Sequence, residues 1–101
     1  MTIEFKRSAK QKQLEEQIVK ANNIALLESE LSQYRVQVES LAQEILMLNS
    51  EIEKLDEKKD TTLIATLTTQ VKVAQEKKEL HETKIHETQT KLKKLKEAPN
   101  D

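Results

Sequence analysis

Hydrophobic residues recur at alternating spacings of three and four along two long segments of this chain. Spacings of three and four place residues in one stripe along an α-helix, so both segments are predicted to be amphipathic helices. The first stripe consists of Ile24, Leu27, Leu31, Tyr34, Val38, Leu41, Ile45, Leu48, Ile52 and Leu55. The second consists of Ile64, Leu67, Val71, Ala74, Lys78, His81, Ile85, Thr88, Leu92 and Leu95, and is interrupted by polar residues in its middle.

The two stripes mirror each other across one turn. If the chain folds back near Lys59 and Asp60, Ile24 meets Leu95, and the pairing continues step by step until Leu55 meets Ile64. Each position of one stripe then finds a position of the other. We therefore predict an all-α fold, an antiparallel two-helix coiled-coil hairpin whose seam is formed by these residues.

The seam divides the chain into five parts. We expect an N-terminal helical arm at 1–22, a main coiled-coil helix at 23–58, a turn at 59–62, a second coiled-coil helix at 63–97 and a tail at 98–101. The hydrophobic positions 18, 21, 24 and 27 are separated by three successive steps of three residues. This spacing indicates a stammer, which is a local overwinding of a coiled coil, beside Asn22 and Asn23. A single helix running through this point is favoured over a break. One uninterrupted helix over the whole chain is the competing interpretation.

The start of the second helix is ambiguous. Asp60, Thr61 or Thr62 can cap it by accepting a backbone N–H bond. The segment 61–73 is rich in β-branched residues, and its apolar positions also alternate as they would in a strand, as in a coil–strand–coil plan of the prefoldin kind. The absence of glycine for tight turns favours the helix.

Several hydrophobic residues lie outside the seam. Leu26, Val36, Leu46 and Met47 fall on other faces of the first helix, and Val73 and Leu80 do so on the second. A helix that is apolar on more than one face requires more than one neighbour, so we expect a higher-order bundle of at least four helices. The residues predicted to bind a partner are Phe5, Leu14, Ile18 and Val19 on the arm, with Leu46 and Met47 on the extra face.

Polar residues occupy part of the second stripe. The mirrored register places Lys78 opposite Leu41 and His81 opposite Val38. A buried ammonium is costly unless it reaches water or a carboxylate. We expect Lys78 to extend outward, with Glu82 one turn further along as its local partner.

Composition excludes most kinds of catalytic site. The 101 residues include no cysteine and no glycine, which removes thiolate metal sites, disulfides and glycine-rich phosphate loops. His81 and His86 are five apart, too far around a helix to hold one metal ion. We expect no enzyme activity, no cofactor and no small-molecule substrate.

Charge and hydropathy bear on location and partners. The net charge is −1, and no apolar stretch approaches the length of a membrane span. We expect a cytoplasmic protein without a signal peptide, although export that reads no cleavable signal is left open. Lysines 91, 93, 94 and 96 would lie near the basic residues at 6–12, so nucleic-acid binding at this end is a minor alternative.

These features favour a non-enzymatic adaptor or chaperone that docks a helical hairpin onto another helical protein. In size and architecture the chain is similar to tubulin-cofactor-A-like bundles and to small helical chaperones or targeting factors of bacterial secretion systems. That similarity, which indicates no family membership, implies a chaperone or targeting role. A self-assembling structural coiled coil is the other interpretation, in which the partner is a second copy.

Overall fold

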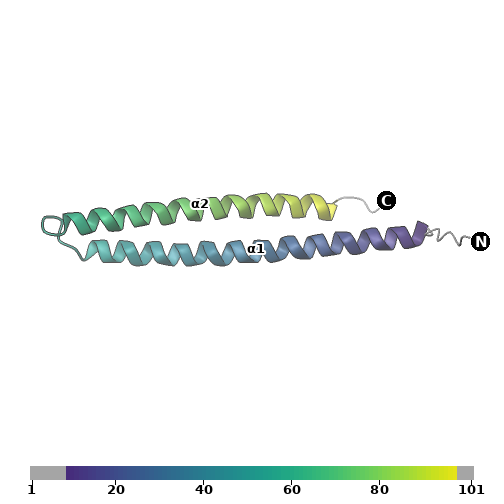
Figure 1. Ribbon diagram of the computed structural model, residues 1–101, viewed down its shortest axis with the longest axis horizontal. Helices are drawn as coiled ribbons and strands as arrows, with labels where there is room; N and C mark the ends of the chain where they lie inside the picture. The colour runs from purple at the N-terminus through teal and green to yellow at the C-terminus, as the bar shows by residue number, and fades with distance from the viewer. Residues whose placement is uncertain (1–8, 98–101) are drawn as a thin grey trace, which may run out of the picture.

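The computed structural model describes residues 9–97, and over this range the chain forms two long helices. Helix α1 spans Ala9–Glu53 and helix α2 spans Thr61–Glu97. They lie side by side and antiparallel, joined by one connection (Figure 1). The predicted all-α helical hairpin is confirmed, and no strand occurs within 9–97.

Both ambiguous stretches of sequence are helical. Helix α1 continues through Asn22 and Asn23 without a break. The threonine-rich segment 61–73 belongs to α2. Its hydroxyl groups bond to carbonyl oxygens one turn earlier, as Thr66 does to Thr62 at 3.0 Å and Thr69 to Ala65 at 2.9 Å. Threonine side chains in a helix can satisfy their polar group in this way, so the β-branched composition does not force a strand.

The connection begins earlier than the sequence predicts. Helix α1 ends at Glu53 rather than at 58, the connection covers 54–60 rather than 59–62, and α2 begins at Thr61 rather than at 63. Bonds between residues three apart tighten the end of α1, where the Lys54 N–H donates to Glu51 at 3.2 Å. The side chain of Asp56 then accepts the N–H of Lys58 at 2.8 Å, which forms a local turn.

Asp60 completes the connection from the other side. Its carboxylate accepts the N–H of Asp56 at 3.0 Å, and its carbonyl oxygen accepts the first helical bond of α2, from Ile64 at 2.8 Å. Asp60 therefore occupies the N-cap position of α2. No residue within 9–97 has a positive φ, which explains how this turn forms without glycine.

The seam is a narrow stripe rather than a globular core. All twenty residues of the two hydrophobic stripes are buried or half-buried. The most buried of them are Leu31, Leu67, Val71, Ala74, Thr88 and Leu92. Thr88 is accommodated because its hydroxyl donates to the carbonyl oxygen of Lys84 at 2.7 Å.

Helix α1 is longer than α2, and the excess lies at its N-terminal end. At 1.5 Å per residue, α1 is about 68 Å long and α2 about 55 Å. The end of α1 and the beginning of α2 lie next to each other at the connection. The N-terminal end of α1 therefore extends past the end of α2 (Figure 1). The overhang is the described part of the predicted arm, residues 9–22.

Candidate protein-binding surface

The arm exposes hydrophobic side chains that no other part of the hairpin covers. Leu14, Ile18 and Val19 are each more than half exposed. Leu14 and Ile18 are four residues apart and so lie on one side of the helix. Phe5, the fourth predicted arm residue, lies outside the described residues. The arm therefore offers a short apolar stripe at the open end of the hairpin.

A second exposed surface runs along the side of α1 that faces away from α2. We call it the α1 outer face. We define it between residues 18 and 50, where its members lie on the side of α1 away from the seam, with Leu26 at the edge beside α2. All are exposed, and Glu39 is the single charged residue among them. They are Ile18, Val19, Asn22, Ala25, Leu26, Ser29, Ser32, Gln33, Val36, Glu39, Ser40, Gln43, Leu46, Met47 and Ser50.

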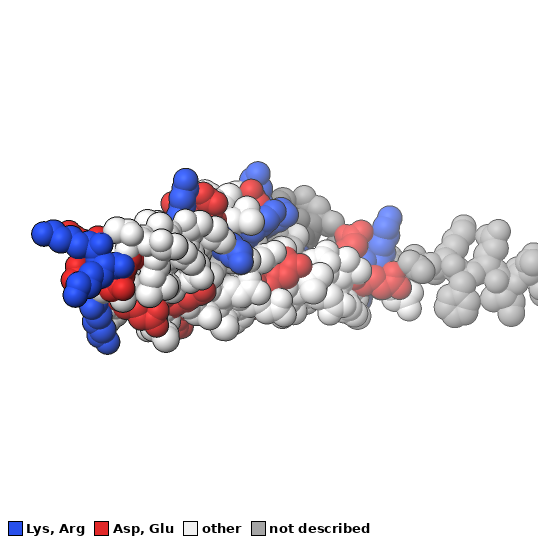
Figure 2. Space-filling view, turned by 60° about the vertical axis from the view of Figure 1, so that its left-hand side comes forward, with Lys and Arg blue, Asp and Glu red and all other residues white. Residues whose placement is uncertain are grey.

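The corresponding side of α2 has a different composition. We call it the α2 outer face, and it is also exposed throughout. It consists of Ala65, Thr66, Thr69, Lys72, Val73, Glu76, Glu79, Leu80, Thr83, His86, Glu87, Thr90, Lys93, Lys94 and Glu97. Beyond Thr69 it carries seven charged residues, which are acidic in the middle (Glu76, Glu79 and Glu87) and include lysines toward both ends. Figure 2 shows charged side chains gathered at the turn and along α2, and a largely uncharged flank on α1.

Hydrophobic residues on the two outer faces are equally accessible but differ in their surroundings. Leu46 on α1 is 62% exposed and Leu80 on α2 is 58% exposed. Leu46 is next to Met47, and the two form a shallow groove of about 320 Å³ with Ser50, Glu51 and Lys54. A second groove of about 390 Å³ surrounds Val36 and is lined otherwise by serine and glutamine.

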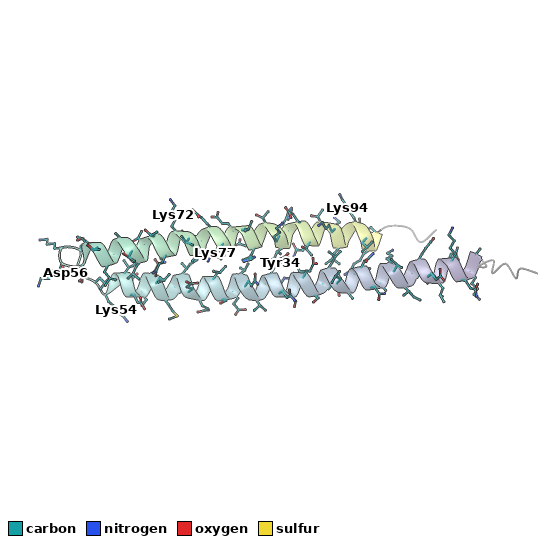
Figure 3. All side chains as sticks on the ribbon, in the orientation of Figure 1. Tyr34, Lys54, Asp56, Lys72, Lys77 and Lys94 are labelled. Carbon is teal, nitrogen blue, oxygen red and sulfur yellow. The ribbon has the colours of Figure 1, made fainter. Side chains whose placement is uncertain are left out.

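Polar residues meet in the middle of the seam. The rings of Tyr34 and His81 stack with centroids 6.0 Å apart, and Tyr34 lies between the two helices (Figure 3). The sequence placed His81 opposite Val38, which is one turn further along α1. A seam residue packs among several residues of the facing helix, so contact with Tyr34 belongs to the neighbouring layer. The His81 Nδ1 atom is buried without a hydrogen-bond partner.

Lys78 extends out of the seam. It is half-buried, and its ammonium lies 3.5 Å from the Glu82 carboxylate, the local partner that the sequence predicts. The side chain can therefore cover the seam with its methylene groups while its charge stays near water. By contrast, Lys72 and Lys94 point away from both helices (Figure 3).

The open end of the hairpin carries charges of both signs. Lys91 and Lys94 line a shallow groove of about 490 Å³ together with Asn23, Leu26, Leu27 and Leu95. Lys96 is 3.1 Å from Glu28 across the helix pair. An acidic partner already neutralises part of this basic cluster, so it is not a uniform basic patch of the kind that binds phosphates.

These surfaces consist of exposed apolar, small polar and charged side chains on two regular helices. Within residues 9–97, no group of three His, Asp or Glu side chains is placed to hold a metal ion. Neither helix is long and apolar enough to cross a membrane. What remains is exposed apolar area on regular helices, which suits packing against other helices.

Part of the α1 outer face is not among the partner-binding residues that the sequence predicts. Leu26 and Val36 lie off the seam, as the sequence predicts, but the predicted binding residues do not include them. The signal that identifies them is the near absence of charge at the outward positions of α1 between residues 18 and 50, whereas the outward positions Lys12, Glu15 and Glu53 on either side are charged. This signal becomes visible only when the outward positions of each helix are compared separately.

The fold and these surfaces define a class, namely helical hairpins with an exposed apolar face on one helix. No known protein family matches the chain, and neither does any curated protein or solved structure.

Proposed function

We propose that this chain is a non-enzymatic protein-binding adaptor or chaperone that docks its hairpin onto another helical protein. The observation that supports this proposal is the exposed apolar surface of α1, which comprises the arm and the α1 outer face. A nucleic-acid role receives less support, because the basic residues of the open end are interspersed with acidic ones.

The arm has the pattern of a helix that docks into a groove. Such helices present hydrophobic residues at spacings of three and four to a partner, and Leu14, Ile18 and Ala21 have this spacing. Burial of each large aliphatic side chain contributes roughly 1.5–3 kcal/mol. Contact through Leu14 and Ile18 would therefore supply a substantial part of the binding free energy of a modest complex.

A self-assembling role is the second candidate, favoured by the distribution of hydrophobic residues along the α1 outer face. The two roles are compatible if the arm and this face bind different chains. A cytoplasmic location and a role as a secretion chaperone or targeting factor remain predictions of the sequence.

The proposed function is tested by capture of a partner with two matched variants. Ile18→Asp introduces a carboxylate into the apolar stripe of the arm, whereas Gln17→Asp introduces the same charge one residue away, at another exposed position. Tagged chains would be used to capture proteins from a lysate, and any captured protein would then be purified and titrated directly. Circular dichroism would show whether both variants keep their helicity.

We expect one helical protein to bind the unmodified chain and the Gln17→Asp variant but not the Ile18→Asp variant. Equal binding by both variants would contradict docking through the arm. Failure to bind any protein selectively would contradict the adaptor role.

A further inference from the structure

The α1 outer face is self-complementary. When a second copy is placed antiparallel against this face, one register pairs Leu26 with Leu46 and Val36 with Val36 of the other copy. The same register pairs Ala25 with Met47. Each large hydrophobic residue between 22 and 50 then faces a hydrophobic residue, and all of these side chains are exposed in the single hairpin.

The polar residues of the α1 outer face are also paired with polar residues in this register. Glu39, its one charged residue, lies opposite Gln33, and Ser32 lies opposite Ser40. A shift by one heptad in one direction would place Leu26 against Glu39 in both halves of the pair, and a shift in the other direction would place Leu46 against Gln33. Small residues at the centre allow the two helix axes to approach closely.

We propose that the α1 outer face binds a second copy of this chain, antiparallel, with Val36 on the two-fold axis. The contact joins α1 to α1, so the four helices lie in one layer in the order α2, α1, α1, α2. Each α2 is then at an outer edge, and its charged outer face points to water. The different compositions of the two outer faces follow directly from this arrangement.

The dimer leaves the first part of each arm, residues 9–18, uncovered. In this register Glu53, the last residue of one α1, lies opposite Val19 of the other copy. Residues 9–18 therefore project beyond the paired stretch, one arm at each end of the layer. The dimer would present two separate apolar stripes containing Leu14 and Ile18. The use of these arms for docking rests on the proposed function, whereas the pairing of the two copies does not.

Disulfide cross-linking tests this pairing directly, because the chain contains no cysteine of its own. Val36→Cys introduces one thiol on the proposed two-fold axis. Thr83→Cys is the matched control, since Thr83 lies directly across the hairpin on the α2 outer face and is likewise exposed. Purified variants would be oxidised under identical mild conditions and the disulfide-linked dimer measured by non-reducing electrophoresis.

Orientation is tested by Leu26→Cys and Leu46→Cys, alone and mixed. In the antiparallel pair the thiol at position 26 of one copy lies beside the thiol at position 46 of the other copy. Two thiols at the same position in the two copies are about 30 Å apart. The mixture should therefore cross-link, and neither variant alone should do so. A parallel pair would behave in the opposite way, because both single variants would cross-link with themselves.

We expect Val36→Cys to form the linked dimer at least about tenfold faster than Thr83→Cys, with the mixed-pair result described above. Equal rates for Val36→Cys and Thr83→Cys would overturn the proposal, as would self-linking of Leu26→Cys alone. Adding Leu14→Asp, which changes an exposed arm residue outside the α1 outer face, to Val36→Cys should leave the cross-linking unchanged. A result of this kind distinguishes failure of arm docking from failure of self-association.

Discussion

The two outer faces of the hairpin have the same geometry and opposite compositions. Between residues 18 and 50, the α1 outer face carries one charged residue, Glu39, among serine, glutamine, alanine and larger hydrophobic side chains. The α2 outer face carries seven charged residues, three lysines and four glutamates, together with threonines. Both faces are exposed in the single hairpin. Their difference supports the proposal that α1, rather than α2, contacts a further helix.

The seam provides a third surface for this comparison, because its hydrophobic residues are buried by the facing helix and those of the outer faces are not. Leu67 and Leu80 are both on α2, but Leu67 is 9% exposed and Leu80 is 58% exposed. Residue type alone does not distinguish them. What distinguishes them is that Leu67 faces α1 and Leu80 faces away from it. The two positions should therefore differ most in how strongly a substitution changes the stability of the hairpin.

Leu67→Asp should prevent stable folding of the hairpin. It places a carboxylate in the seam and removes a buried leucine, which together cost roughly 3–5 kcal/mol, a large share of the 5–15 kcal/mol typical of domains. Leu80→Asp changes an exposed position and should alter the free energy of unfolding by no more than about 0.5 kcal/mol. Thermal unfolding followed by circular dichroism measures both, and similar melting curves for the two variants would contradict the observed seam.

A smaller, stabilising effect is expected from His81→Leu. The substitution removes a buried Nδ1 atom that has no partner, a group that costs about 1–3 kcal/mol, and it loses ring stacking with Tyr34 worth about 0.5–1.5 kcal/mol. The net gain of about 1 kcal/mol corresponds to a Tm higher by about 4–8 °C. His86→Leu, at an exposed position, should leave the Tm nearly unchanged. A lower Tm for His81→Leu would show that the ring contact outweighs the unpaired nitrogen.

The smallest effect concerns the charge on the α1 outer face. Gln33→Lys places an ammonium opposite Glu39 of the second copy, twice in each symmetric dimer. Exposed ion pairs contribute about 0.2–1 kcal/mol each, so two of them should make the dimer roughly two- to thirtyfold tighter. The gain should be smaller at high salt. Gln33→Glu should weaken it by a comparable factor. Sedimentation equilibrium measures these dissociation constants, and identical values for the two variants would exclude the proposed register.

The seam could be predicted from the sequence because its determinants are regular. The spacing of residues such as Leu31 and Leu92 follows from the period of the α-helix, and the same spacing places all twenty stripe positions in the contact between helices. The ends of the connection could not be placed as well. They depend on two carboxylates, Asp56 and Asp60, each accepting a specific backbone N–H.

Other features required the relative placement of the helices. The stacking of Tyr34 on His81 depends on side-chain rotamers in adjacent layers of the seam, and the simple pairing of opposite residues does not give it. The full extent of the α1 outer face became clear once the covered side of α1 was known. The arm was recognised from sequence because its hydrophobic residues lie beyond the reach of the second helix.

Light scattering coupled to size-exclusion chromatography, over a range of concentrations, tests the central claim that α1 and not α2 carries the binding face. The unmodified chain and the Leu80→Asp variant should both approach twice the chain mass of 11.7 kDa as concentration rises. The Leu46→Asp variant should remain at the mass of one chain, with its helicity preserved. A chain that stays monomeric throughout, or equal masses for the two variants at every concentration, would contradict the claim.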